Sequence, residues 1–428
     1  MSNLNLVWLV LLAGTAVFFA LQCLVILKMK VDAGYLFAFC LYFDLFGYFY
    51  KMVLPGQALL LLIAAPLLPV AVALLYKPTS SWGFLRDQGF WLWGLFLVYA
   101  LLSLAWAPSE SEGLMKEIVL LAHGVVPAIY IYIVYKKYGR FSWNVVVWAG
   151  LIYAIAHLLL GVYTEEYPGR LTLPGGNPIF NARASLLTVT VCLWARSIPF
   201  PVRVIAAGIA MASALATQSR GPLAAFLIAN ALFFIVWAVR KYRDKKGSIR
   251  LSRFAVPMLL LLLMAGAALS MYGQQLSDWV GGSRFTVLFD RAQLQGDDNF
   301  IGRVELQLKA AEKLDASPFF GAGLGGVTPP LARDFPHNIV MEISAELGLV
   351  GLALWTFAVL FSLWAALKYA TVLAVLLVQC IGYAMLSGDF GFNYEYVVMA
   401  FVALALLPER IGKGVAVTYE NIVSYHRV

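Results

Sequence analysis

The sequence predicts an all-α, polytopic membrane protein with twelve or thirteen transmembrane helices. Of its 428 residues, 62% are hydrophobic and 13% are charged, and the mean hydropathy of +0.81 lies far above that of soluble globular domains. Apolar runs close to the roughly 20 residues that cross a bilayer as a helix cover most of the chain. A transmembrane β-barrel would instead show short alternating strands. The chain therefore reads as a helical membrane protein.

Thirteen apolar segments are candidate spans. They lie at about residues 5–27, 33–52, 55–76, 89–107, 117–135, 142–162, 178–196, 202–218, 221–239, 254–273, 345–368, 370–387 and 392–408. The second segment contains Asp44 and Lys51, so it is either a span or a re-entrant piece. Twelve spans place both chain ends in the cytoplasm, whereas thirteen place the N-terminus outside. The first apolar run is too long for a cleavable signal peptide and lacks the preceding basic patch.

The basic residues orient these spans by the positive-inside rule. One short loop is crowded with Arg240, Lys241, Arg243, Lys245, Lys246, Arg250 and Arg253. A second basic turn lies at residues 136–140. With both on the cytoplasmic side, the extracytoplasmic segments are residues 163–177, 217–222 and 274–336. The net charge of +8 reflects this asymmetry and an affinity for anionic membrane lipids, and it gives no reason to expect a nucleic-acid partner.

Four parts follow from this topology. They are a transmembrane part at residues 1–273 that includes the external loops 163–177 and 217–222, a large external segment at 274–336, a second transmembrane part at 337–408, and a cytoplasmic tail at 409–428. Inside the spans, His123 and His157 are expected to bond between helices rather than relay protons. Core packing, rather than disulfide or metal binding, is expected of Cys23, Cys40, Cys192 and Cys380.

The stretch from Ser317 to Gly351 combines glycine-rich turns with a histidine ahead of an apolar helix. Positive φ angles are open to Gly321, Gly323, Gly325 and Gly326. Beyond His337 the apolar residues recur every three or four positions, which predicts a helix with His337 in its first turn. Unpaired N–H groups at a helix start attract anions and lower the pKa of a nearby imidazole. His337 is thus either a proton acceptor at neutral pH or a capping or packing residue.

Several arginines fall on the predicted external side. Arg220 ends a span where Gly221-Pro222 opens the next helix, which pairs a guanidinium with a helix N-terminus as in phosphate-binding sites. Arg303 stands at the head of a predicted external helix. Arg183 lies one turn into a span, where it either meets an anion or extends to the lipid headgroups. Other external arginines are Arg170, Arg284 and Arg291, of which the last two lie in an acidic segment suited to surface ion pairs.

Asp297 and Asp298 are the residues to weigh for a metal site. Metal-dependent glycosyl transfer uses carboxylates to hold a divalent ion on the donor diphosphate. The pair lies in a Gly-Asp-Asp-Asn sequence that is more typical of a turn. We therefore expect a turn here, and no metal or other cofactor.

With these residues, the chain resembles the O-antigen ligase and polymerase superfamily of bacterial inner membranes. Positions 337–351 are similar to the ligase signature, which is His-Asn, nine residues and then Gly-x-x-Gly. Supporting matches are the Ser219-Arg220-Gly221 turn, the Pro318-Phe-Phe-Gly-Ala-Gly323 run and the loop from Arg170 to Pro178. Together these matches cover roughly residues 165–355, while the N-terminal third matches only in hydropathy.

The resemblance implies a glycosyltransferase-C-like fold and a particular reaction. O-antigen would pass from undecaprenyl diphosphate to a sugar hydroxyl of the lipid A–core, by inverting, metal-independent transfer at the periplasmic face of a Gram-negative inner membrane. His337 would be the general base, and Arg220 and Arg303 would hold the diphosphate. Four further residues are candidates for substrate binding, which are Asn338, Arg170, Arg183 and Arg291. The external segment would cover the cleft.

Other functions stay open beside the ligase. An O-antigen polymerase and a protein O-oligosaccharyltransferase belong to the same superfamily, and a polysaccharide flippase or transporter is the alternative from another class. The His-Asn spacing favours the ligase, and the short tail after Arg410 leaves no room for the extra domain expected of a protein-glycosylating enzyme. Transporters tend to show inverted repeats and ionisable residues near the midplane. This chain shows no internal repeat, and most of its charges gather at the external ends.

Overall fold

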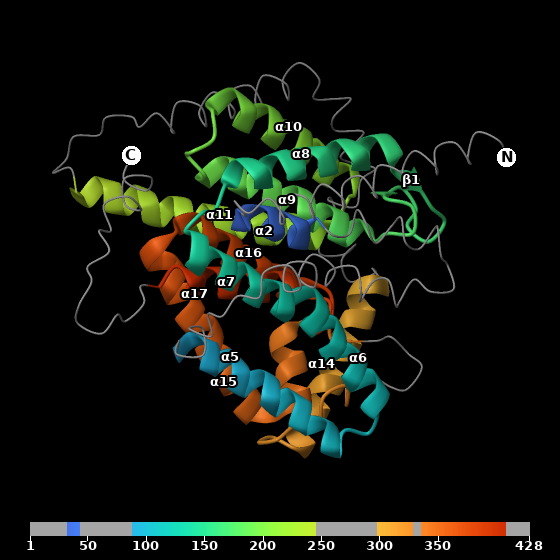
Figure 1. Ribbon diagram of the computed structural model, residues 1–428. Helices are drawn as coiled ribbons and strands as arrows, with labels where there is room; N and C mark the ends of the chain where they lie inside the picture. The colour runs from blue at the N-terminus through green and yellow to red at the C-terminus, as the bar shows by residue number, and fades with distance from the viewer. Residues whose placement is uncertain (1–31, 43–87, 245–297, 328–334, 408–428) are drawn as a thin grey trace, which may run out of the picture.

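The computed structural model describes residues 32–42, 88–244, 298–327 and 335–407, and within these ranges the chain is mostly helical (Figure 1). The helices of the first half are α2 (Ala33–Leu41), α5 (Gln88–Leu102), η3 (Ser103–Trp106), α6 (Glu110–Leu120), η4 (Leu121–Val125), α7 (Val126–Tyr138), α8 (Trp143–Leu160), α9 (Pro178–Trp194) and α10 (Phe200–Ala216). The later helices are α11 (Arg220–Asp244), α14 (Asp298–Ala316), α15 (Ile339–Tyr369), α16 (Thr371–Leu386) and α17 (Glu395–Ala405). A small antiparallel hairpin joins β1 (Val162–Tyr163) to β2 (Leu171–Thr172).

Five helical stretches in the described residues are long and apolar enough to cross a membrane, which agrees with the predicted helical membrane class. They are Gln88–Trp106, Ser111–Lys136, Trp143–Leu160, Arg220–Ala238 and Ile339–Tyr369. Four shorter apolar helices, α9, α10, α16 and α17, occupy further predicted spans. The count of twelve or thirteen spans stays a prediction, because the segments predicted at 5–27, 55–76 and 254–273 lie outside the described residues. So do Asp44, Lys51 and Cys23.

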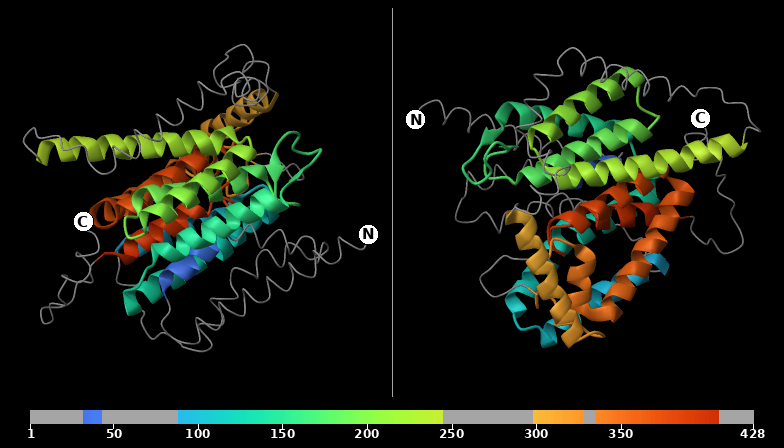
Figure 2. Two further views of the ribbon diagram at one scale, coloured as in Figure 1. Left: turned by 90° about the horizontal axis from the view of Figure 1, so that it is seen from above. Right: turned by 180° about the vertical axis from the view of Figure 1, so that it is seen from behind.

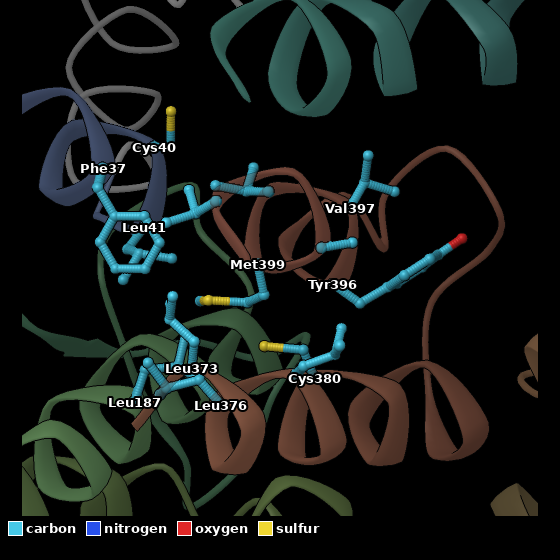
Figure 3. Packing of buried hydrophobic residues seen from close by; sticks show 14 of the residues in the cluster. Phe37, Cys40, Leu41, Leu187, Leu373, Leu376, Cys380, Tyr396, Val397 and Met399 are labelled. Atoms are coloured by element: carbon cyan, nitrogen blue, oxygen red, sulfur yellow. The ribbon is translucent and has the colours of Figure 1, made fainter. Parts of the chain in front are cut away.

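The core of the bundle lies around α16 and α17. Every residue of α17 is buried, and α16 buries a face that includes Leu373, Leu376 and Cys380. Figure 3 shows these side chains packed against Leu187 of α9 and Phe37 and Leu41 of α2. Because α2 begins 32 residues into the chain and α17 ends at Ala405, distant parts of the sequence share one hydrophobic core. The described cysteines, Cys40, Cys192 and Cys380, are free and buried, as predicted.

The connecting loops lie at two ends of this helical bundle (Figure 2), and hydrogen bonds join the loops at each end. At one end, the turn after α10 bonds to the loop after α8, through Arg170 Nη2 and Ser219 Oγ at 2.7 Å. At the other end, Lys136 of α7 donates to the carbonyl of Leu407 beyond α17, and Asp32 accepts from the backbone N–H of Ser142. Residues 163–177 and 217–219 therefore share the first end, which we call the site end, and residues 139–142 and 406–407 share the opposite end.

Helix α15 is interrupted near its start. Gly348 has φ 66° and ψ −170°, so a short first half, Ile339–Leu347, ends there and a second half continues to Tyr369. The loop from Pro318 to Gly323 enters this break. Its carbonyls accept from Leu349 and Val350 at the start of the second half, and its N–H groups donate to Ala345 and Glu346 at the end of the first. Backbone groups that the break frees are thus paired, as burial in an apolar region requires.

At the break, both the helix and the loop that enters it have room only for glycine, at Gly348 and Gly321. A Cβ at Gly348 would lie 2.3 Å from the carbonyl of Phe319, and one at Gly321 would lie 2.3 Å from the carbonyl oxygen of Glu346. Gly321, Gly323 and Gly325 have positive φ, as predicted, whereas Gly326 does not. The Gly-x-x-Gly part of the signature therefore marks a helix break and its close backbone contact with the preceding loop.

Candidate functional site

His337 lies ahead of α15 rather than in its first turn, which corrects the prediction. Asn338 is the N-cap, and its Oδ1 accepts from the backbone N–H groups of Val340 and Met341 at 3.1 and 3.2 Å. His337, one residue before this cap, has φ 54°, a left-handed conformation that few residues other than glycine adopt. The imidazole therefore projects from a strained turn that the capped helix holds in place.

The His337 ring is partly buried, and its Nδ1 has no hydrogen-bond partner among the residues that the structure describes. Its ring packs edge-on against Phe335 with 4.4 Å between centroids. Burial, together with the nearby positive charges of Arg303 and Arg183, lowers the pKa of His337 to about 4. The pKa is thus lowered as expected, but chiefly by burial and arginines. Above this pH the imidazole is neutral and can accept a proton.

Arginines gather at the C-terminal end of α16. Arg303 Nη1 donates to the carbonyl of Leu386 at 3.1 Å, and Arg183 Nη2 donates to that of Ser387 at 2.8 Å. Gly221, next to Arg220 at the start of α11, lies against Leu386, since a Cβ there would be 3.5 Å from the Leu386 Cβ. Helix C-termini attract cations because their last carbonyls are unpaired. Three guanidinium-bearing segments from α9, α11 and α14 therefore meet at one helix end.

Arg303 is not at the head of its helix. The helix α14 already includes Asp298, which places Arg303 more than one turn inside. This helix packs along α15, and Gln307 donates to the carbonyl of Pro336 at 3.4 Å (Figure 1). Because the bond reaches the residue before His337, α14 connects Arg303 to the histidine turn. The predicted meeting of these two residues has a clear structural basis.

Arg183 and Arg170 have partners within the protein. Arg183 is 1% exposed and pairs with Glu395 of α17 at 3.4 Å, so the alternative in which it extends to lipid headgroups is wrong. Arg170 Nε donates to the carbonyl of Thr217 at 3.0 Å and stacks on Tyr167. Its position fixes the turn that precedes Arg220. Substrate binding by either arginine stays a prediction, while the structure gives both a clear role in shaping the site end.

The loop that carries Arg170 is held by a buried polar network. His157 Nδ1 lies 2.8 Å from Ser213 Oγ, and its Nε2 lies 3.3 Å from the carbonyl of Leu171. Asn181 of α9 binds Thr172 and the hydroxyl of Tyr153 through its amide. His157 thus bonds between helices, as expected of a histidine inside a span.

Sequence reasoning missed a buried ion cluster. Lys116 of α6 lies 2.5 Å from Glu342 Oε1 and 2.7 Å from Glu346 Oε1, and all three side chains are at most 6% exposed. Both glutamates belong to the first half of α15. Their spacing of four residues within an apolar run was the available signal, because charges inside apolar spans are rare and usually functional.

Some predicted residues lie outside the described part of the chain. These residues are Arg284, Arg291 and Asp297. Of Asp298, the structure describes only the backbone, as the first residue of α14. Their roles, including the choice between a turn and a metal site, stay predictions.

Taken together, the site end offers a neutral imidazole beside two arginines, with a third arginine at the neighbouring helix start. Such a set can take a proton from a hydroxyl and neutralise an anionic leaving group. Residues 205–356, about a third of the chain, match the Wzy_C family model, which is described as O-antigen ligase. A comparison with curated protein sequences finds no match. The matched residues include Arg220, Arg303, His337 and Gly348, so this part of the chain is similar to the O-antigen ligase family.

Proposed function

We propose that the protein is an O-antigen ligase. It transfers a polysaccharide from undecaprenyl diphosphate to a sugar hydroxyl of the lipid A–core, and the site end of the bundle faces the periplasm. The observation that carries the proposal is the His337 imidazole, which burial and the charges of Arg303 and Arg183 keep neutral at physiological pH. The family match supports lipid-linked polysaccharide substrates in general.

In this reaction the acceptor hydroxyl attacks the anomeric carbon of the donor sugar. His337 takes the hydroxyl proton through Nδ1, the ring nitrogen that has no partner in the described residues. The bond from the anomeric carbon to the diphosphate oxygen breaks, and the diphosphate leaves with the bonding electrons. Arg220 and Arg303 neutralise this developing charge, as guanidinium groups do through paired hydrogen bonds. No other group is needed for the chemistry.

A reconstitution assay tests the proposal. Purified protein, lipid A–core and an undecaprenyl-diphosphate glycan should yield a larger lipopolysaccharide product, with a chelator present. We expect His337→Ala to lower the rate by about 10² to 10⁴-fold, the usual contribution of a general base, and Arg220→Ala by about 10² to 10³-fold. Arg196→Ala removes an exposed arginine at the opposite end and should leave the rate unchanged.

The same assay separates the alternatives. A polymerase would lengthen the lipid-linked glycan without using lipid A–core, and a protein O-oligosaccharyltransferase would require a serine- or threonine-containing acceptor. A product that forms only with a divalent ion would move the diphosphate site towards Asp297 and Asp298. Normal ligation by well-folded His337→Ala protein would reject the base assignment.

A further inference from the structure

The cluster of Lys116, Glu342 and Glu346 has no part in the proposed chemistry. Its two glutamates, however, belong to the helix segment that directly follows His337. Lys116 donates to Glu342 Oε1 and to Glu346 Oε1 at 2.5 and 2.7 Å. Asp389, in the loop before α17, is close enough to act electrostatically on the same lysine. All four residues are buried, and the cluster links α6, α15 and this loop.

Such a cluster is costly to bury, because each charge loses its water. Glu342 and Glu346 are four residues apart on one helix face, where two carboxylates repel each other unless a cation lies between them. Only the Oε1 atom of each glutamate contacts Lys116, and Glu342 Oε2 is buried without a hydrogen-bond partner in the described residues. The lysine is therefore what makes this arrangement tolerable.

The first half of α15 is too short to be stable as an isolated helix. Between the Asn338 cap and the break at Gly348, the first half of α15 has about two turns, and isolated helices of this length are unstable. The loop in the break fixes its C-terminal end through Ala345 and Glu346. Lys116 fixes its middle against α6. His337 precedes its N-terminal end, so the place of the imidazole relative to Arg303 depends on how firmly this short helix is seated.

We propose that Lys116 is a positioning residue for His337. Its ammonium holds Glu342 and Glu346 against α6, and the short helix thereby keeps the imidazole beside Arg303. The inference rests on the proposed function, in which His337 is the base. Lys116 itself touches neither substrate nor reacting atoms.

The test compares Lys116→Met with Lys368→Met in the reconstituted assay. Both changes remove a lysine, but Lys368 is an exposed residue in the last turn of α15, far from the cluster. Misplacement of a reacting group by about 1 Å costs on the order of 100-fold in rate. We therefore expect Lys116→Met to lower kcat by about that factor, with KM for the donor changed less than threefold or so. Lys368→Met should match the unsubstituted protein.

A pH profile separates positioning from a merely structural role. The charged groups that act on His337 are Arg303 of α14 and Arg183 of α9. If the His337 ring moves away from these arginines and becomes exposed in Lys116→Met, its pKa should rise. The acid limb of kcat/KM should then move from about pH 4 towards 6.5, the ordinary histidine value. Lys116→Arg, which keeps the charge, should restore much of kcat and the original acid limb.

Hydrogen exchange gives a readout that needs no activity. In Lys116→Met, amides of residues 339–347 should exchange at least about tenfold faster, while those of α16 stay protected. The inference is overturned if Lys116→Met keeps the normal rate, or if activity falls only in proportion to folded protein with the acid limb unmoved. If His337→Ala is fully active, the base assignment fails instead. An inactive His337→Ala beside a normal Lys116→Met would defeat this inference alone.

Discussion

The Asn338 side chain decides where the turn that carries His337 ends and the helix begins. Asparagine is among the best N-cap residues because its side-chain oxygen accepts from free N–H groups of the first turn. Periodicity alone put His337 inside that turn, since apolar spacing does not identify the cap. The capping geometry moves the helix start to Ile339 and leaves His337 in a left-handed conformation. The residue was predictable from the sequence, whereas its conformation was not.

The environment of His337 predicts the pH dependence of the reaction. Its pKa is lowered to about 4, so the free enzyme should lose kcat/KM only as the pH falls towards that value. A bound diphosphate adds negative charge, which favours the protonated imidazole and raises its pKa. We therefore expect the acid limb of kcat to lie at higher pH than that of kcat/KM.

Steady-state rates between about pH 4 and 8 check this order. The protein should first be shown to stay folded over the range. Acid limbs that coincide near 6.5 would mean that the ring is neither buried nor close to the arginines during turnover.

At the residue scale, the partners in buried ion pairs could not be predicted when they lie far apart in the sequence. The Lys116–Glu346 and Arg183–Glu395 pairs each join positions more than two hundred residues apart. No local pattern reveals such a partner. The sequence left Arg183 either meeting an anion or reaching the lipid headgroups, and only the packing of α9 against α16, and of α16 against α17, identifies Glu395.

Among the elements, the broken helix α15 has the strictest sequence requirement. Its hydrophobic pattern continues through Gly348, so periodicity predicted one uninterrupted helix. The break depends on the Pro318–Gly323 loop, whose backbone takes the place of helical partners. The signature glycine was visible in the sequence, but its physical role needed the contact with Phe319.

Gly348→Ala should damage the protein locally. The change forces alanine into a backbone conformation that is essentially confined to glycine, which costs about 1–3 kcal/mol, and its Cβ would lie 2.3 Å from the Phe319 backbone. We expect a strong loss of ligation and increased exchange in residues 339–347, measured on protein that still inserts into the membrane.

Gly208→Ala is the matched control. Gly208 lies within α10, and no atom lies within 4 Å of a Cβ added there. Alanine is the better helix former by about 1 kcal/mol, so activity and thermal stability should be kept or slightly improved. Equal effects of the two alanines would show that the break is unimportant.

At the scale of the whole molecule, the loops group at two ends of the bundle, while the membrane topology that charge predicted stays a prediction. Residues 163–177 and 217–219 share an end, and so do residues 139–142 and 406–407. The span count could not be settled in the same way, because apolar length does not distinguish a span from a re-entrant helix. Helices α9 and α17 show the difficulty, since 17 and 11 residues are short for a crossing.

Cysteine labelling tests which end faces the periplasm. Glu165 and Ser197 are exposed residues at the site end and the opposite end. With a membrane-impermeant maleimide and a permeabilised outer membrane, Glu165→Cys should react in intact cells, and Ser197→Cys only after lysis. The unsubstituted chain controls for its native cysteines. The reverse pattern would place His337 in the cytosol and exclude the proposed reaction.

The interruption at Gly348 also bears on how two lipid-linked substrates can meet. From Leu349 to Tyr369 the second half of α15 has about 21 residues and rises about 32 Å, close to the thickness of the hydrocarbon layer. In the proposed orientation, the half that follows His337 would then stand among the phosphates of the outer leaflet. Donor and acceptor could each keep their tails immersed while their sugars react above, and neither would need to be extracted from the bilayer.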